Sequence, residues 1–182
     1  MSMLFPILFS LVLVFGPAFA LIILFARSLR DVRNAVQNRV FEENANAAAA
    51  TTSFRVNYRS DGHFRSASAW RCGAVHPASW EGTGVLFIGN EKAMFVGSNL
   101  TTHESMNIEF ELGETGVRWI GRTLFRKGGV SWLQIDFRDK KHFFSAETGI
   151  TNLGSKAKTR ALFEECCRAS KSASVTSSHA PM

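Results

Sequence analysis

The sequence predicts a mainly β fold: an antiparallel sheet system of about seven strands, followed by a C-terminal helix and preceded by an N-terminal transmembrane helix. Three observations support this class. Residues 1–26 contain no charged side chain, short segments of alternating apolar and polar residues follow from Phe54 onward, and residues 155–169 carry a helical pattern. Strands at such short spacing, with no helix between them, favour an antiparallel sheet over βαβ units.

Residues 1–26 are predicted to be the transmembrane helix. The 24 residues from Met3 to Ala26 carry no charge, and roughly 20 residues at ~1.5 Å each span a hydrocarbon core of ~30 Å. A cleaved signal peptide is the alternative, because Ala18-Phe19-Ala20 has the small-x-small form of a cleavage site. No positive segment precedes the run, and the run continues beyond Ala20, so the sequence favours a membrane anchor.

The charges after this segment predict its orientation. Arg27, Arg30 and Arg33 follow the apolar run directly. Positive residues beside a membrane helix tend to stay in the cytoplasm. We therefore expect a single-pass protein of the cell membrane, with its N-terminus outside and the domain after Arg27 in the cytoplasm.

Residues 27–52 are predicted to be a juxtamembrane helix followed by a linker. Apolar residues recur here at steps of three and four, which is an amphipathic helical pattern; they are Leu29, Val32, Val36 and Val40. Such a helix either extends the transmembrane helix into water, lies on the headgroups or pairs with another helix. Residues 44–52 then lose all charge and large apolar side chains, as a linker before a domain at 53–169 would.

The domain begins with a predicted strand in which Phe54, Val56 and Tyr58 alternate with polar residues. The C-terminal helix over 155–169 has Ser155 as a plausible N-cap. Residues 170–182 offer little to bury, so we expect a disordered tail. Further strands are predicted over 68–75, 84–89, 93–98, 107–112, 117–124, 132–137 and 141–145.

This layout resembles the pleckstrin-homology (PH) superfold. The segment from Gly84 to Gly97 is similar to a hairpin of GRAM and bacterial PH-like domains, in which a Gly-x-Leu strand leads through an Asn turn into an apolar-aromatic strand. The resemblance covers about residues 68–169. It implies a partly open antiparallel barrel of about seven strands, made of two nearly orthogonal sheets and capped at one open end by the C-terminal helix. A generic β-barrel or sandwich with a helix is the competing fold.

Charge is unevenly distributed along the domain. Residues 81–114 hold six acids and one lysine, whereas residues 117–171 hold twelve cations and five acids. Each cation close to an anionic leaflet gains roughly 1 kcal/mol, so a basic face would bind phospholipid; otherwise both stretches are ordinary solvated faces. The candidate binding residues on the basic face are Arg118, Arg122, Arg126, Lys127, Lys140 and Lys141.

One departure from the resemblance concerns the first hairpin, where phosphoinositide-binding PH domains carry a Lys and Arg cluster. The matching loop at 76–82 has neither residue, and Arg71 alone precedes it. Trp80 in this loop either inserts into a membrane interface, as aromatic belts do, or packs under the sheet. Tight phosphoinositide binding at this loop is therefore not expected.

The sequence shows no catalytic or metal-binding constellation. Cys72 and His76 would be too far apart on a strand, and the adjacent Cys166 and Cys167 point to different sides of a helix. No phosphate-binding, hydrolase or metalloprotease motif is present, so we expect no enzyme, no metal and no cofactor. Mixed charge without a binding motif also argues against nucleic acid as a partner.

Two functional hypotheses follow. In the first, the protein is a membrane-anchored binding module whose PH-like domain contacts anionic phospholipid of the cytoplasmic leaflet through its basic face. In the second, it is a structural or assembly subunit that binds other membrane proteins through its helix or a strand edge. The PH-like fold serves both uses.

Overall fold

The computed structural model describes residues 4–66, 80–121, 130–147 and 156–178, and within the first helix most side chains from Gly16 onward. The helices are α1 (Leu4–Glu43), α2 (Ala45–Ala50), α3 (Asp61–Ser66), the 3-10 turn η2 (Leu112–Glu114) and α4 (Lys156–Ser178). The strands are β1 (Thr52–Ser60), β2 (Gly82–Ile88), β3 (Lys92–Asn99), β4 (Ser105–Glu111), β5 (Gly116–Ile120), β6 (Trp132–Phe137) and β7 (Lys140–Ser145).

The seven strands form one open antiparallel sheet in the order β4-β3-β2-β1-β7-β6-β5. Strand β1 joins the two halves, because residues 52–58 pair with β2 and residues 57–60 pair with β7. Among the described strands, β4 and β5 form the two edges. The mainly β class, the seven antiparallel strands and the C-terminal helix are thus as predicted, and the arrangement is consistent with a PH-like barrel.

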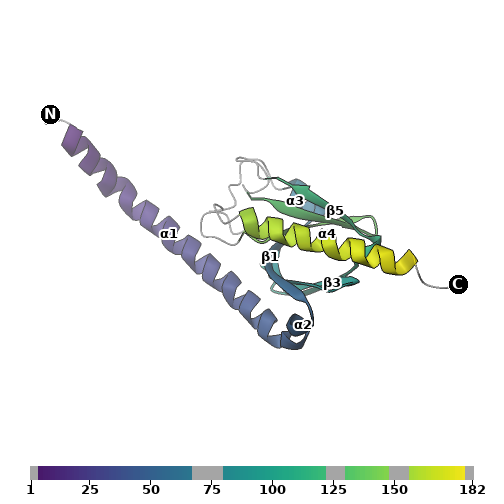
Figure 1. The fold of residues 1–182 in the computed structure, drawn as a ribbon. Coiled ribbons are helices and arrows are strands. Elements are labelled where there is room, and N and C mark those ends of the chain that lie inside the picture. The colour runs from purple at the N-terminus through teal and green to yellow at the C-terminus, as the bar shows by residue number, and fades with distance from the viewer. Residues whose placement is uncertain (1–3, 67–79, 122–129, 148–155, 179–182) are drawn as a thin grey trace.

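Helix α4 closes the domain core, and Figure 1 shows it lying across the sheet. Leu162 and Cys166 of α4 are fully buried with the inward side chains of the sheet. Farther along the helix, the Ser170 hydroxyl donates a hydrogen bond of 2.9 Å to the carbonyl of Leu112. Fully burying one leucine side chain contributes about 1.5–3 kcal/mol. Through the contacts of Leu162, Cys166 and Ser170, α4 joins the end of β4 to the β5 half of the sheet.

Most predicted strands are confirmed within one or two residues. Strand β5 ends at Ile120, and the rest of the prediction over 117–124 lies largely outside the described residues, as does the prediction over 68–75. The β6–β7 turn falls where the sequence placed it. Arg138 and Asp139 adopt φ angles of 47° and 60° there, in the left-handed region that tight turns use.

The structure corrects the prediction of a linker at residues 44–52. The chain is helical through Glu43, and α2 occupies six of the residues assigned to the linker at 44–52. Val36 and Val40 pack against the outer face of the sheet, where they meet Val85 and Phe87 of β2. Val32, one turn earlier on the same helix, remains 51% exposed. The packing of Val36 and Val40 therefore joins the C-terminal end of α1 to the folded domain.

Figure 1 shows the first half of α1 projecting away from the domain and only the second half lying beside it. Among the described residues, no helix combines the length and the apolarity that crossing a membrane requires.

The predicted disordered tail is also corrected, because α4 continues to Ser178. Ala173 is 7% exposed and lies against Gly113. Small side chains at these positions let the helix approach η2 closely. The contact gives residues beyond 169 a surface to pack on, which their composition did not indicate.

Candidate binding groove

The predicted basic face is only partly visible. Arg118 is exposed on β5, Lys140 is exposed at the start of β7, and Lys141 lies opposite Asp136 of β6. A carboxylate directly across the strand pair offsets the charge of this lysine. Three further candidates, Arg122, Arg126 and Lys127, lie outside the described residues.

Trp80 packs under the sheet, the second of its two predicted fates. Its side chain is 3% exposed and clusters with Trp132 and Phe143. The guanidinium carbon of Arg59 lies 5.4 Å from the Trp80 ring centroid and 5.0 Å from that of Trp132. Burial lowers the pKa of Arg59 to about 10, although the nearby Glu81 opposes this shift. The Trp80 ring is therefore part of a core and not a surface anchor.

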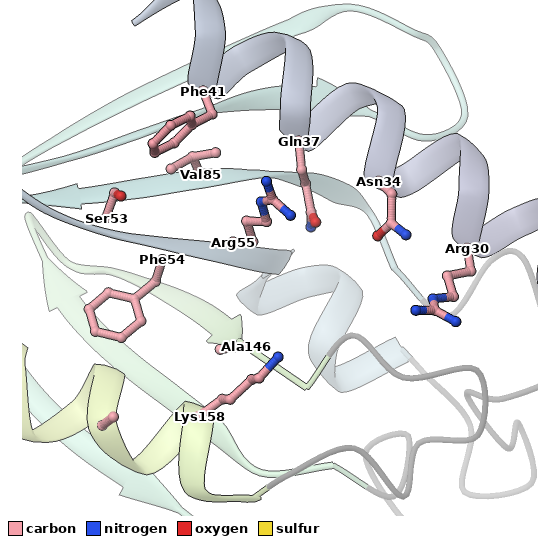
Figure 2. A pocket seen from close by; sticks show the side chains of 11 residues that line it. Arg30, Asn34, Gln37, Phe41, Ser53, Phe54, Arg55, Val85, Ala146 and Lys158 are labelled. Carbon is pink, nitrogen blue, oxygen red and sulfur yellow. The ribbon is translucent and has the colours of Figure 1, made fainter. Parts of the chain in front are cut away.

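A groove of about 520 Å³ lies where the second half of α1 passes the sheet. It is bounded by α1, by β1 and β2, and by the start of α4. Figure 2 shows its side chains converging from these elements. The lining residues are Arg30, Asn34, Gln37, Phe41, Ser53, Phe54, Arg55, Val85, Ala146, Lys158 and Ala161.

Three of the described lining residues are cations, and each comes from a different element. Arg30 lies on α1, Arg55 on β1 and Lys158 in the first turn of α4. In Figure 2 all three side chains extend into the space between these elements. The eleven lining residues include no carboxylate, and none of the three cations forms a salt bridge with a described residue.

Local structure explains why these side chains meet. Along β1, Val56 and Tyr58 enter the core, so Arg55 projects from the opposite face, on which α1 lies. On α1, Arg30 is seven residues before Gln37, two helical turns along the same face. The positive charge of the region is reinforced by Arg33, whose pKa is lowered by burial and then by the neighbouring Arg30.

The floor of the groove is a buried hydrogen-bond network. Gln37 is 1% exposed, and its Nε2 donates to the Val56 carbonyl at 3.2 Å and to the Thr83 hydroxyl at 2.8 Å. That hydroxyl donates to Asn57 Oδ1 at 3.0 Å. Buried polar groups need such partners, so the network fixes the position of α1 along β1 and β2, and with it the position of Arg30.

The groove has the chemistry of an anion-binding site. Guanidinium and ammonium groups donate charge-assisted hydrogen bonds to phosphate and carboxylate oxygens. Among the residues that the structure describes, no group of three His, Cys, Asp or Glu side chains could hold a metal ion. The Cys166 thiol is buried, which raises its pKa to about 12, so it stays protonated near neutral pH.

Sequence reasoning missed two of the three groove cations. Arg30 was predicted only to orient the membrane helix, and Arg55 and Lys158 were not singled out. The polar stripe of Arg30, Asn34 and Gln37 between the valines of α1 was the available signal. It could not indicate which part of the chain faces it, because Arg55 and Lys158 are distant in sequence.

Comparison with protein-family models, curated proteins and solved structures finds no match to this chain.

Proposed function

We propose that the protein is a membrane-anchored, non-enzymatic binding module of PH-like architecture that contacts anionic lipid of the cytoplasmic leaflet. The observation that carries the proposal is the groove, whose described lining residues include three cations and no carboxylate. Each cation near an anionic leaflet gains roughly 1 kcal/mol. Three together supply about 3 kcal/mol, or roughly a hundredfold in affinity.

The anchor in this proposal is the first part of α1. The uncharged run from Met3 to Ala26 has 24 residues, about 36 Å of helix against a hydrocarbon core of ~30 Å. Arg27, Arg30 and Arg33 follow it and favour a cytoplasmic domain under the positive-inside rule. The protein is then single-pass, with its N-terminus outside.

This placement sets the groove beside the lipid headgroups. Arg30 lies four residues past Ala26, about 6 Å farther along the helix axis. The headgroup layer is roughly 5–8 Å thick on each side of the hydrocarbon core. Arg30 therefore sits at headgroup depth, which brings the groove that it lines close to the leaflet.

The PH-like assignment draws support from the order of the strands and from α4. The hairpin that carries the sequence resemblance pairs Gly84 with Gly97 and Leu86 with Phe95. In this protein the lipid contact is made outside the barrel, between α1 and the sheet. The loop that phosphoinositide-binding PH domains use supplies no cation here.

The test uses the full chain in zwitterionic detergent micelles, with either phosphatidylglycerol or phosphatidylcholine added. Because a ligand that binds the folded state stabilises it, phosphatidylglycerol should raise the melting temperature by several degrees, and 0.5 M salt should reduce this shift. The variant R30Q/R55Q/K158Q should lose the shift. R39Q/R160Q is the control for a general loss of positive charge, although it removes two charges and not three, because both arginines are exposed, lie in helical ion pairs and are not among the residues that line the groove. Equal shifts for the two variants would overturn the proposal.

The assembly hypothesis also has one supporting observation. Strand β4 is an edge strand, and among the described elements it pairs only with β3. An exposed edge can accept a strand from a partner. If phosphatidylglycerol has no effect on the wild-type chain, a protein partner at β4 becomes the favoured function.

A further inference from the structure

The charge of the groove distinguishes between kinds of anionic ligand. Arg30, Arg55 and Lys158 place three positive charges around one space, and the lining residues that the structure describes include no carboxylate. A lipid phosphodiester carries one negative charge and would leave two of these cations unbalanced. A phosphate monoester carries nearly two charges at neutral pH, because its second pKa is about 6.

The donors suit the geometry of a terminal phosphate. Arginine presents paired N–H groups that bind phosphate oxygens in a bidentate manner, and a monoester has three free oxygens to receive the Arg30, Arg55 and Lys158 donors. The amide of Asn34 lies between Arg30 and Gln37 in Figure 2 and adds a neutral donor. Gln37 is unavailable to the ligand as a donor, because its amide hydrogens face Val56 and Thr83.

The size of the groove points to more than a lone phosphate ion. Its volume of about 520 Å³ falls within the ~300–1,000 Å³ range of small-molecule sites. Phe54, Ala146 and Ala161 add apolar surface to the lining. Such surface fits the carbon skeleton that carries the phosphate in a lipid.

We infer that the groove binds the phosphate monoester headgroup of a membrane lipid in preference to a phosphodiester headgroup. This inference rests on the proposed function and names the ligand class of the same site. Phosphatidic acid is the simplest lipid with this headgroup. A soluble phosphate monoester shares the chemistry, so the experiment separates the two sources.

The experiment measures dissociation constants for the full chain in zwitterionic detergent, from shifts in melting temperature. The probes are dioctanoyl phosphatidic acid, dioctanoyl phosphatidylglycerol, glycerol 3-phosphate and inorganic phosphate. At pH 7.5, phosphatidic acid should bind at least about tenfold more tightly than phosphatidylglycerol, because the three cations of the groove can interact with both negative charges of the monoester. At pH 5.0 this ratio should shrink, because the monoester then carries one charge.

The pH change acts on the ligand, because no histidine or carboxylate lies among the described residues that line the groove. The single variants R30Q, R55Q and K158Q should each weaken phosphatidic acid binding more than phosphatidylglycerol binding. R39Q/R160Q should bind both lipids as the wild type does. Unliganded melting temperatures verify folding, and removing one of three like charges should leave them unchanged or higher.

The possible failures are distinguishable. Equal affinity for phosphatidic acid and phosphatidylglycerol at both pH values would overturn the monoester preference while leaving the anionic-lipid function intact. Binding of neither lipid would overturn both. Glycerol 3-phosphate or inorganic phosphate binding as tightly as phosphatidic acid would overturn the lipid as the source of the phosphate.

Discussion

Gln37 of α1 donates a hydrogen bond of 2.8 Å to the hydroxyl of Thr83 on β2, across 46 residues of sequence. Both side chains are almost completely buried. The bond joins the helix that continues the proposed membrane anchor to the central part of the sheet. Val36 and Val40 supply the apolar part of the same contact, so the helix and the sheet form one folded unit.

Replacing Gln37 with Ala should destabilise the domain. The change removes two buried hydrogen bonds, to the Val56 carbonyl and to the Thr83 hydroxyl. At about 0.5–1.5 kcal/mol each, their loss should cost about 1–3 kcal/mol. Denaturant unfolding of the full chain in detergent, followed by tryptophan fluorescence, measures the loss. Asn38→Ala is the control, since Asn38 is the exposed neighbour on the same helix. Similar losses for the two variants would contradict this account.

Stability should fall with acidification through His142. Its Nδ1 lies 3.1 Å from the Tyr58 hydroxyl, and its pKa is lowered, first by burial and then by Lys140, with Glu81 opposing. The unfolded chain therefore takes up the proton first, so stability is complete above about pH 6.5 and declines as the pH falls below it. Unfolding free energies at pH 7.5 and 5.5 measure the decline. His142→Gln should reduce it, whereas His103→Asn, at an exposed histidine, should not.

Arg59→Lys should weaken the aromatic cluster. The planar guanidinium lies over the rings of Trp80 and Trp132, and lysine cannot reproduce this stacking. A desolvated cation–π contact is worth about 2 kcal/mol, so we expect a loss of about 1–2 kcal/mol together with a change in tryptophan emission. Arg55→Lys on the same strand is the matched control. An unchanged emission spectrum in Arg59→Lys would argue against the stacked arrangement.

Gly84→Ala should be among the most damaging small substitutions in the sheet. A Cβ at Gly84 would collide with the backbone of Val96 and Gly97 on β3, whereas one at Gly116 meets its nearest atom, Asp136 Cβ, at an ordinary 3.4 Å. Overpacking costs about 1–3 kcal/mol or more when the backbone must shift. The melting temperature should therefore fall clearly for Gly84→Ala and little for Gly116→Ala. A reversed order would refute the close approach of β2 and β3.

The predictions that the structure confirms are those that depend on residues close together in the sequence. Alternation along β1 to β7 is a property of neighbouring residues, and so is the helical pattern of α4. The packing of Val36 and Val40 on Val85 and Phe87 was not predictable, because periodicity shows that a helix face is apolar but not what covers it. The extension of α4 depends in the same way on its contact with Gly113.

The candidate groove could not be predicted from the sequence for a related reason. Arg30, Arg55 and Lys158 are adjacent only because α1, β1 and α4 meet there. The charge count along the chain pointed to residues 117–171, a range that includes Lys158 but neither arginine. The sequence analysis therefore identified a cationic surface without identifying the two arginines that complete the groove. Only the register between α1 and the sheet brings the three cations together.

Because α1 is one continuous helix from Leu4 to Glu43, it fixes the rotation of the domain about the helix axis relative to the first part of the helix. Each residue of an α-helix turns the chain by about 100° and advances it by about 1.5 Å. Inserting one residue between Ala26 and Arg30 would rotate the whole domain by about 100° about the helix axis. The groove would then face a different direction at nearly the same depth. Inserting seven residues would return it almost to its original heading, about 10 Å deeper in the cytoplasm. In the proposed membrane orientation, the direction in which the domain faces is therefore set by a residue count within one helix.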